Sequence, residues 1–182
     1  GDQPATTGPR VVPGEYTLRM TAGTETHEQP FRIVPDPRHA TTTEEFQAQY
    51  DLLLQIRDKL SETNDAINRV RRVQDQVDGW VERAKGSKSE KKLADAAEAL
   101  NAKLHDAEAQ LIQVNANSPK DTLHYPVMLN TKLVRVANAI ASADMAPTRQ
   151  AQEVFADLSA QVDTQISAIN AAIDKDVPAF NK

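Results

Sequence analysis

The chain has 182 residues, and its hydrophobic share of 40% is enough for a core of ordinary size. Aromatic residues make up only 4%, which favours a core of Leu, Ile, Val and Ala, as in helix bundles. The net charge is −5 and basic residues are interleaved with acidic ones, so we expect no nucleic-acid partner, because that binding needs a concentrated positive face. The absence of cysteine excludes disulfides, thiolate zinc sites and cysteine nucleophiles. No apolar run approaches the roughly 18 residues of a membrane-spanning helix, so no membrane insertion is expected.

Residues 1–38 have the pattern of a β-hairpin. Apolar and polar side chains alternate on both sides of a turn signal at residues 22–24, which is the period of a half-buried strand. The apolar positions are Tyr16, Leu18 and Met20 before the turn and Phe31 and Ile33 after it. Pro30 indicates that the second strand is an edge strand or carries a bulge, because proline cannot donate a hydrogen bond to a neighbouring strand.

A hairpin of two strands is too small to be stable alone in water. Three arrangements would complete it, and the sequence leaves them open. The hairpin can be the remnant of a small β-sandwich-like domain, which we favour as its origin. It can also lie against the rest of the chain, or form a homodimer through its open edge.

Residues 39–182 have the pattern of a helical bundle. The first helix is expected to follow a threonine cap at residues 41–43, where Glu44 and Glu45 suit the positive end of the helix dipole. Its apolar seam steps by three and four residues as far as Ala84, and Gly86 should end it. A helix of roughly 42 residues is about 60 Å long, so the bundle should be long as well.

Three further segments show the same helical periodicity. The second keeps a regular heptad, the third follows Pro126 and is the shortest, and the fourth is expected to end at Pro178. Four such segments over residues 43–177 predict a mainly α fold, an antiparallel up-and-down four-helix bundle preceded by the β-hairpin. The first helix should overhang the short third one, or the loop at residues 115–126 should fill that gap.

The chain shows no pattern of a catalytic, cofactor-binding or metal-binding site. None of the histidines lies three or four residues from another, as two metal ligands on one helix would. They are His27, His39, His105 and His124. No Glu-x-x-His pair, Gly-rich phosphate loop or Gly-x-Ser-x-Gly nucleophile occurs. We therefore expect no catalytic residue, no cofactor and no metal in this chain.

Three residues are candidates for contact with a partner. Trp80 is the only tryptophan, and it either caps the far end of the bundle or contacts a partner, since Trp is enriched at interface hot spots. His124 and Tyr125 lie in the longest loop. Tyr125 either plugs the space over the short third helix or belongs with His124 to a binding loop.

The order of several short motifs resembles the C-terminal region of large exported bacterial β-propeller proteins. Those proteins carry Asp-box (BNR) repeats and are described as glycosyl-hydrolase-like or sortilin-like. The motifs lie at 13–19 (PGEYTLR), 34–38 (VPDPR), 63–72, 125–126 ahead of 129–133 (LNTKL), 143–148 (ADMAPT) and 176–181 (DVPAFN). In that family a propeller is followed by a small sandwich-like domain and then a helical tail.

The resemblance implies a non-catalytic accessory or interaction module at the C-terminus of an exported multidomain protein, located outside the cell or in the periplasm. Its partners would be the other domains of the parent protein, or a protein or glycan. The alternative is a carbohydrate- or cell-surface-binding module, or a scaffold part of a glycoside hydrolase whose active site lies in the propeller. No Asp-box occurs in this chain, so the resemblance carries no catalytic residue onto it.

Overall fold

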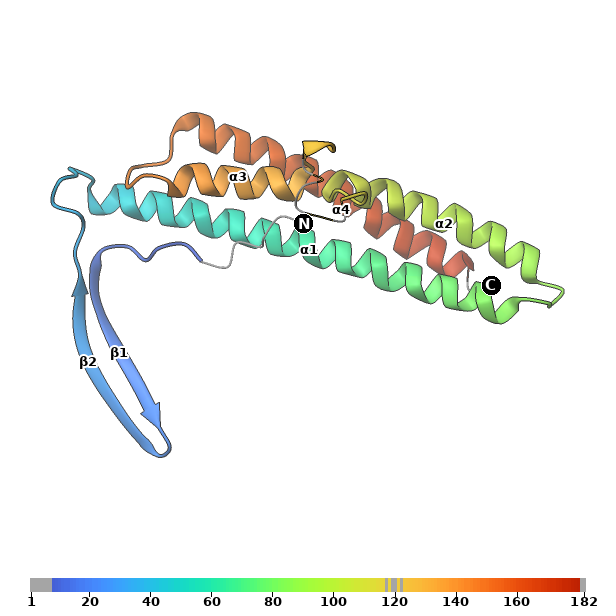
Figure 1. The fold of residues 1–182 in the computed structure, drawn as a ribbon, viewed down its shortest axis with the longest axis horizontal. Coiled ribbons are helices and arrows are strands. Elements are labelled where there is room, and N and C mark those ends of the chain that lie inside the picture. Colours follow the sequence, from blue (N-terminus) through green and yellow to red (C-terminus); the bar gives the residue numbers. More distant parts are fainter. Residues whose placement is uncertain (1–7, 117, 119–120, 122, 181–182) are drawn as a thin grey trace.

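The computed structural model describes residues 8–116, 118, 121 and 123–180. It contains a β-hairpin that stands off one end of an elongated bundle of helices (Figure 1). The elements are β1 (Gly14–Ala22), β2 (Glu25–Ile33), α1 (Thr43–Ala84), α2 (Glu90–Leu111), α3 (Leu129–Ala141) and α4 (Arg149–Phe180). The prediction of a mainly α fold, with a hairpin followed by a bundle of four helices, is confirmed.

Helix α1 begins and ends where the sequence predicts. The Thr42 hydroxyl accepts a hydrogen bond from the Glu45 backbone N–H (3.2 Å), and the Glu45 carboxylate accepts one from the Thr42 N–H (2.8 Å). This capping box satisfies two backbone donors that the helix itself leaves unpaired. At the other end, Gly86 takes a φ of 77°, a left-handed conformation that glycine adopts without steric cost.

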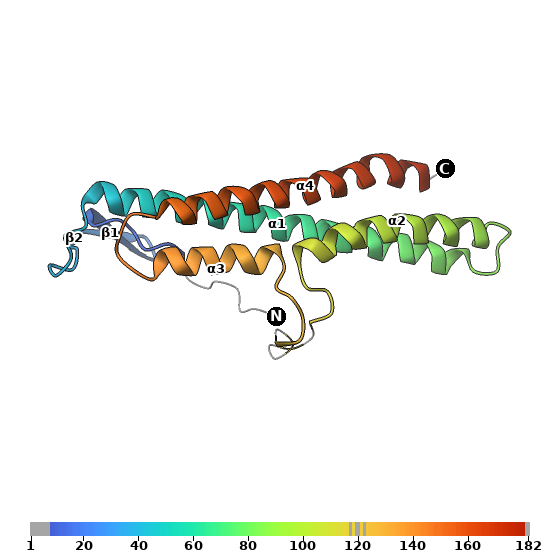
Figure 2. The same cartoon turned by 90° about the horizontal axis from the view of Figure 1, so that it is seen from above.

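Helices α2 and α3 lie end to end, and both run antiparallel to α1 (Figures 1 and 2). Helix α2 covers the far half of α1, where Asn101 donates to the Asp78 carboxylate at 2.9 Å. Helix α3 covers the half near the hairpin, where the Gln49 amide donates to the Ile140 carbonyl at 2.8 Å. The two helices together therefore take the place of one long helix beside α1.

Helix α4 runs parallel to α1. Lys59 pairs with Asp163 at 2.7 Å, and further along both helices Arg69 donates to Asn170 at 2.8 Å. An up-and-down order would make these two helices antiparallel, so the predicted order of helix directions is wrong. The reason is the connection between α2 and α3, which continues in the same direction instead of reversing it.

The end-to-end arrangement also removes the predicted gap over the short third helix. Helices α2 and α3 have 22 and 13 residues, and in tandem they cover α1 with its 42 residues. The described residues of the connection between them stand out from the side of the bundle (Figure 2).

The fourth helix does not end at Pro178, as predicted, but runs on to Phe180. Proline lacks a backbone N–H and crowds the carbonyl four residues earlier, so it costs most in the middle of a helix. In the last turn of α4 only one intrahelical bond is lost.

The core is aliphatic and draws on all four helices, as the seams predict. The most deeply buried side chains are Ile56, Thr63, Val70, Leu104, Leu111, Leu133, Val162 and Ile169. Thr63 is the one hydroxyl in this set, and it donates to the Lys59 carbonyl at 2.7 Å, so its polar group is satisfied. The buried Glu108 carboxylate accepts a hydrogen bond from Arg71 at 2.8 Å, which joins α2 to α1.

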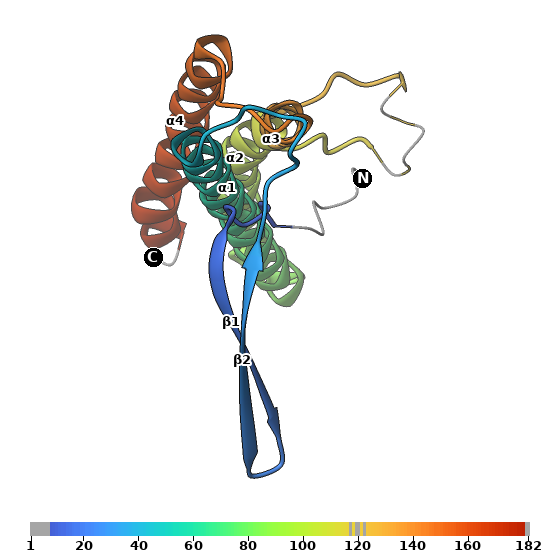
Figure 3. The ribbon, with the colours of Figure 1, turned by 90° about the vertical axis from the view of Figure 1, so that its left-hand side faces the viewer.

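The hairpin is regular and closes with a two-residue turn. Ala22 pairs with Glu25, and Gly23 between them has a φ of 62°, as the first central residue of a type II′ turn requires. Pro30 pairs with Thr17 without a bulge, so it marks an edge strand. Neither strand packs against a helix within the described residues, and Figure 3 shows the hairpin projecting away from the bundle. The arrangement in which the hairpin lies against the bundle is thus excluded for the strands.

Leu104 provides a test of the core. Leu104→Asp should lower the free energy of unfolding by about 4 kcal/mol or more, because it removes a fully buried leucine and buries a charge without a partner. Ala102→Asp is the matched control, since Ala102 is exposed on the same helix. It should lower stability by only about 1 kcal/mol, because Asp has a lower helix propensity and lies four residues from Glu98 and Asp106. Chemical denaturation followed by circular dichroism measures both. Equal midpoints for the two variants would contradict the assigned core.

Candidate functional site

Trp80 lies near the end of α1 that is farthest from the hairpin, and its side chain is exposed. The Arg83 guanidinium lies over the indole ring, 4.3 Å from its centroid. This cation–π contact holds the ring against its own helix. Trp80 therefore presents one face to solvent and does not close the end of the core.

His124 and Tyr125 lie in the connection between α2 and α3, which stands out from the middle of the bundle (Figures 2 and 3). Their backbone N–H groups both donate to the Asp121 carbonyl, at 2.9 and 3.0 Å, so a tight turn displays them. Both side chains are exposed, and Tyr125 plugs no gap. Leu123 beside them is 84% exposed, and the sequence pattern did not single it out.

The three predicted contact residues do not form one site. Trp80 belongs to the distal end of α1, whereas His124 and Tyr125 leave the bundle at the junction of α2 and α3. A partner that contacts all three would have to cover half the length of the bundle. We therefore treat them as two separate surfaces.

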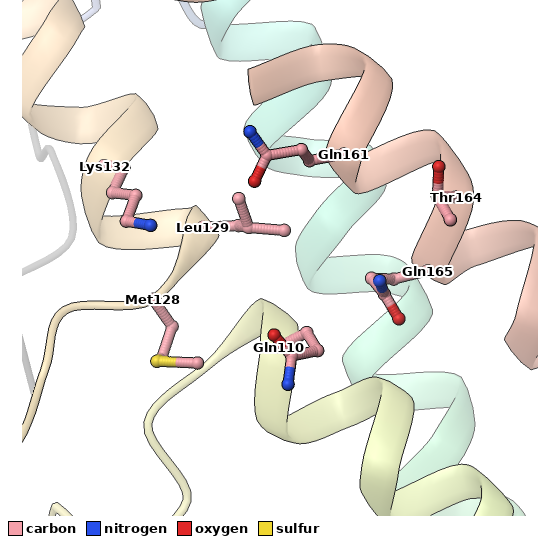
Figure 4. A pocket seen from close by; sticks show the side chains of 7 residues that line it. All are labelled: Gln110, Met128, Leu129, Lys132, Gln161, Thr164 and Gln165. Carbon is pink, nitrogen blue, oxygen red and sulfur yellow. The ribbon is translucent and has the colours of Figure 1, made fainter. Parts of the chain in front are cut away.

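A small hollow lies at the α2–α3 junction and faces α4 (Figure 4). Gln110 reaches it from the last turn of α2 and Lys132 from the first turn of α3. The lining is completed by Met128, Leu129, Gln161, Thr164 and Gln165. Its volume is about 150 Å³, whereas pockets for ordinary ligands start at about 300 Å³.

The polar groups that line this hollow are suited to hydrogen bonding. Amides, one hydroxyl and one ammonium can hold a small polar molecule, but the lining contains no carboxylate or imidazole to act as a general base. No aromatic ring lines it on which a sugar could stack. The junction of α2 and α3 creates the hollow, because two helix ends meet there where a continuous helix would fill the space.

Several exposed apolar side chains of the described chain share one face of the hairpin. We call it the hairpin face, and it consists of Tyr16, Leu18, Met20 and Phe31. Leu18, Met20 and Phe31 are 60%, 57% and 44% exposed. The rings of Tyr16 and Phe31 pack against each other with centroids 5.9 Å apart, and the Tyr16 hydroxyl donates to the Val12 carbonyl at 2.5 Å. The sequence predicts this alternation of apolar and polar residues, but it does not show that the apolar side chains are exposed to solvent.

The opposite face of the hairpin is polar and bears two cross-strand ion pairs. Glu15 lies 3.4 Å from Arg32, and Arg19 lies 2.5 Å from Glu28. Such pairs directly across a ladder stabilise it by a few tenths of a kcal/mol to about 1 kcal/mol each. The hairpin is therefore amphipathic. One side is polar, and the other is mainly apolar, although Gln29 and His27 stand on it opposite Leu18 and Met20.

The root of the hairpin is tied to the bundle. Arg10 lies 3.6 Å from the Asp144 carboxylate in the α3–α4 corner, and the Thr41 hydroxyl donates to the Asp144 carbonyl at 2.5 Å. These contacts join the chain on both sides of the hairpin to one corner of the bundle. They position the hairpin, and at its root Ile33 of β2 lines a hollow together with Phe46 and Gln49 of α1.

The turn from β2 to α1 is fixed by Asp36 and Arg38. The Arg38 guanidinium donates to both carboxylate oxygens of Asp36, at 2.6 Å from Nη2 and 3.0 Å from Nε, and its backbone N–H donates at 2.9 Å. These bonds, the side-chain ones above all, stabilise the charged carboxylate. They lower the pKa of Asp36 from its ordinary value of 3.8 to about 2.

The part of the chain that the structure describes contains no group of three or more His, Cys, Asp or Glu side chains placed to hold a metal ion. No helix in the same part is long and apolar enough to cross a membrane. Comparisons with protein-family models, with curated proteins and with solved structures find no match to this chain.

The Asp36 turn can be tested by its pH dependence. In an NMR titration Asp36 should have a pKa of about 2, and Arg38→Gln should bring it back towards 3.8, because the donors to the charged form are removed. The pKa of Asp36 is lower in the folded chain than in the unfolded chain. The Asp36–Arg38 contacts therefore stabilise the fold fully above about pH 3.8, and this contribution is lost as the pH falls towards 2.

Arg57→Gln is the control for this titration, because Arg57 pairs with Asp58 on the surface of α1. It should leave the pKa of Asp36 unchanged. A wild-type Asp36 that titrates near 3.8 would show that the Arg38 contacts do not persist in solution.

Proposed function

We propose that this chain is a non-catalytic interaction module, in which a stiff helical bundle carries a β-hairpin that packs its apolar face against another protein domain. The observation that supports this proposal is the exposure of Leu18, Met20 and Phe31 on strands that do not pack along any described helix. Contiguous apolar surface of this kind marks interaction sites in soluble proteins.

The stability of the hairpin supports the same proposal. Two strands alone are marginally stable in water, and a third layer or further strands are needed to bury their apolar side. The ties of Arg10 and Thr41 to Asp144 fix the root of the hairpin but cover none of its apolar side chains. A docked domain would supply the missing layer.

The resemblance to exported bacterial β-propeller proteins suggests the kind of domain. In such a parent protein the hairpin would complete a small sandwich-like domain next to the propeller, outside the cell or in the periplasm. A β-sheet is a suitable cover, because sheets pack face to face through alternating apolar side chains. The bundle would then hold or position that domain. The carbohydrate-binding alternative, with Trp80 and the loop at residues 115–126 as contacts, receives less support, because the exposed rings of Trp80 and Tyr125 lie on two separate surfaces.

Hydrogen exchange tests this proposal. The amide exchange of β1 and β2 should be measured in this chain alone, at low concentration, and in the parent protein that joins it to its neighbouring domains. We expect fast exchange in the isolated chain and protection in the parent, because the covered strands no longer open freely.

A pair of variants separates the two faces of the hairpin. Leu18→Ser with Phe31→Ser removes the hairpin face and should abolish the protection in the parent. Thr21→Ala with Thr26→Ala changes the opposite face, where the two hydroxyls lie 3.3 Å apart, and should leave protection in place. Equally fast exchange of the strands in the chain and in the parent would contradict the proposal.

A further inference from the structure

The two edges of the hairpin differ in what they can bind. In a hairpin closed by a two-residue turn, hydrogen-bonded pairs alternate along the strands, starting from the pair that flanks the turn. Here that pair is Ala22 and Glu25. The residues between the hydrogen-bonded pairs therefore direct their backbone N–H and C=O groups outward. On β1 these residues are Glu15, Thr17, Arg19 and Thr21, and on β2 they are Thr26, Glu28, Pro30 and Arg32.

The outer edge of β2 is blocked at its centre. Pro30 has no N–H to offer, and its carbonyl accepts a hydrogen bond from the Gln29 side-chain amide at 3.3 Å. Proline is a common device against unwanted strand pairing. β1 contains no proline, and the two charged residues among its outward positions, Glu15 and Arg19, are of opposite sign. The outward backbone groups of β1 form no hydrogen bond within the described residues.

We propose that the open edge of β1 pairs with β1 of a second copy of this chain, antiparallel and with Thr17 opposite the partner's Thr17. The product is a four-stranded sheet in the order β2–β1–β1–β2, with a twofold axis at its centre. The seam is isologous, so the same residues serve both copies.

Charge complementarity selects this second copy and this register. With Thr17 at the axis, Glu15 lies opposite the partner's Arg19, and Arg19 lies opposite the partner's Glu15. Each copy already pairs Glu15 with Arg32 and Arg19 with Glu28. The sheet then carries two rows of four alternating charges, in each of which every charge has only opposite neighbours.

Other registers lose this match. A register shifted by two residues places Thr17 opposite one of the two charged positions, and a shift by four places Arg19 opposite Arg19 or Glu15 opposite Glu15. Like charges directly opposite each other destabilise a strand pair. Shifts by an odd number of residues turn the apolar side chains to the polar face.

The apolar side gains from the same pairing. Tyr16 comes to lie opposite the partner's Leu18 on both sides of the axis, which extends the hairpin face across the seam. Antiparallel pairing also places the two bundles at opposite ends of the sheet. The apolar side of the sheet stays available to another domain, so this inference does not depend on the proposed function.

The oligomeric state of the isolated chain tests the pairing. We expect a reversible monomer–dimer equilibrium in sedimentation over a concentration series. Thr17→Pro should weaken the dimer about tenfold or more, because it removes the hydrogen bonds that the two Thr17 N–H groups donate at the axis. Thr26→Pro is the matched control, since it places proline at an outward position of β2, and it should change dissociation by less than about threefold.

A charge variant keeps the proposal testable if Thr17→Pro disrupts the hairpin itself. Glu15→Arg places like charges opposite each other at the seam and should abolish dimers. Glu28→Arg breaks an ion pair of the same kind away from the seam, and it should leave most of the dimer. Because the seam pairs are exposed, added salt should weaken the wild-type dimer.

Single cysteine substitutions test the register. The chain contains no cysteine of its own, so any disulfide must join the introduced residues of two copies. Opposite residues of a hydrogen-bonded pair have Cα atoms about 5.5 Å apart, which a disulfide can bridge. Mild oxidation should therefore link Thr17→Cys into dimers faster than Thr21→Cys, whose side chains lie far apart in the proposed sheet.

A wild-type chain that stays monomeric at every concentration would overturn the inference, as would equal dissociation of the Thr17→Pro and Thr26→Pro variants. Linking of Thr21→Cys in preference to Thr17→Cys would exclude the register. The proposed function has a separate test, namely hydrogen exchange in the parent protein at low concentration and its response to substitution of Leu18 and Phe31. Its failure can therefore be told apart from failure of the dimer.

Discussion

The seam of α1 must be covered along its whole length, and this requirement determines the rest of the bundle. An apolar stripe on a helix of 42 residues cannot remain in water, because helix stability in proteins comes mainly from the packing of such a face. Each of the other helices that the structure describes is shorter. Two shorter helices placed in tandem cover one side of the stripe, and α4 covers the other. The parallel course of α1 and α4 follows, because α3 returns the chain to the hairpin end before α4 begins.

The helices were predictable from sequence, whereas their directions were not. The seam residues Leu104, Leu133 and Val162 are fully buried, and α1 stops before Gly86, as local periodicity and helix-stop signals predict. Periodicity shows which side of a helix is buried but not which way the next helix runs. The direction of the next helix depends on the connection after Leu111, which is long enough either to reverse the chain or to let it continue in the same direction. Contacts such as that of Lys59 with Asp163 decide between the two directions, and no local pattern encodes them.

The hairpin shows the same limit of local patterns. Alternation located the strands, the turn at Gly23 and the edge position of Pro30. It also indicated a half-buried sheet, and half-burial needs a partner layer that the described chain does not supply. The surface at Leu18, Met20 and Phe31 was therefore predicted as apolar but not as exposed. Leu123 was missed because a single leucine in a polar loop has no periodicity, and its exposure follows only from the way its turn leaves the bundle.

The break between α2 and α3 has a consequence for how the chain could be divided. A cut in this connection would yield one piece with the hairpin, α1 and α2, and another with α3 and α4. Each piece contributes a long helix to the full length of the core, and α4 packs on α2 as well as on α1 and α3. Each piece buries only part of its own seam, so the two should recognise each other and reassemble without a covalent link. The connection between α2 and α3 is therefore a suitable site at which to divide the chain into two fragments for split-protein complementation.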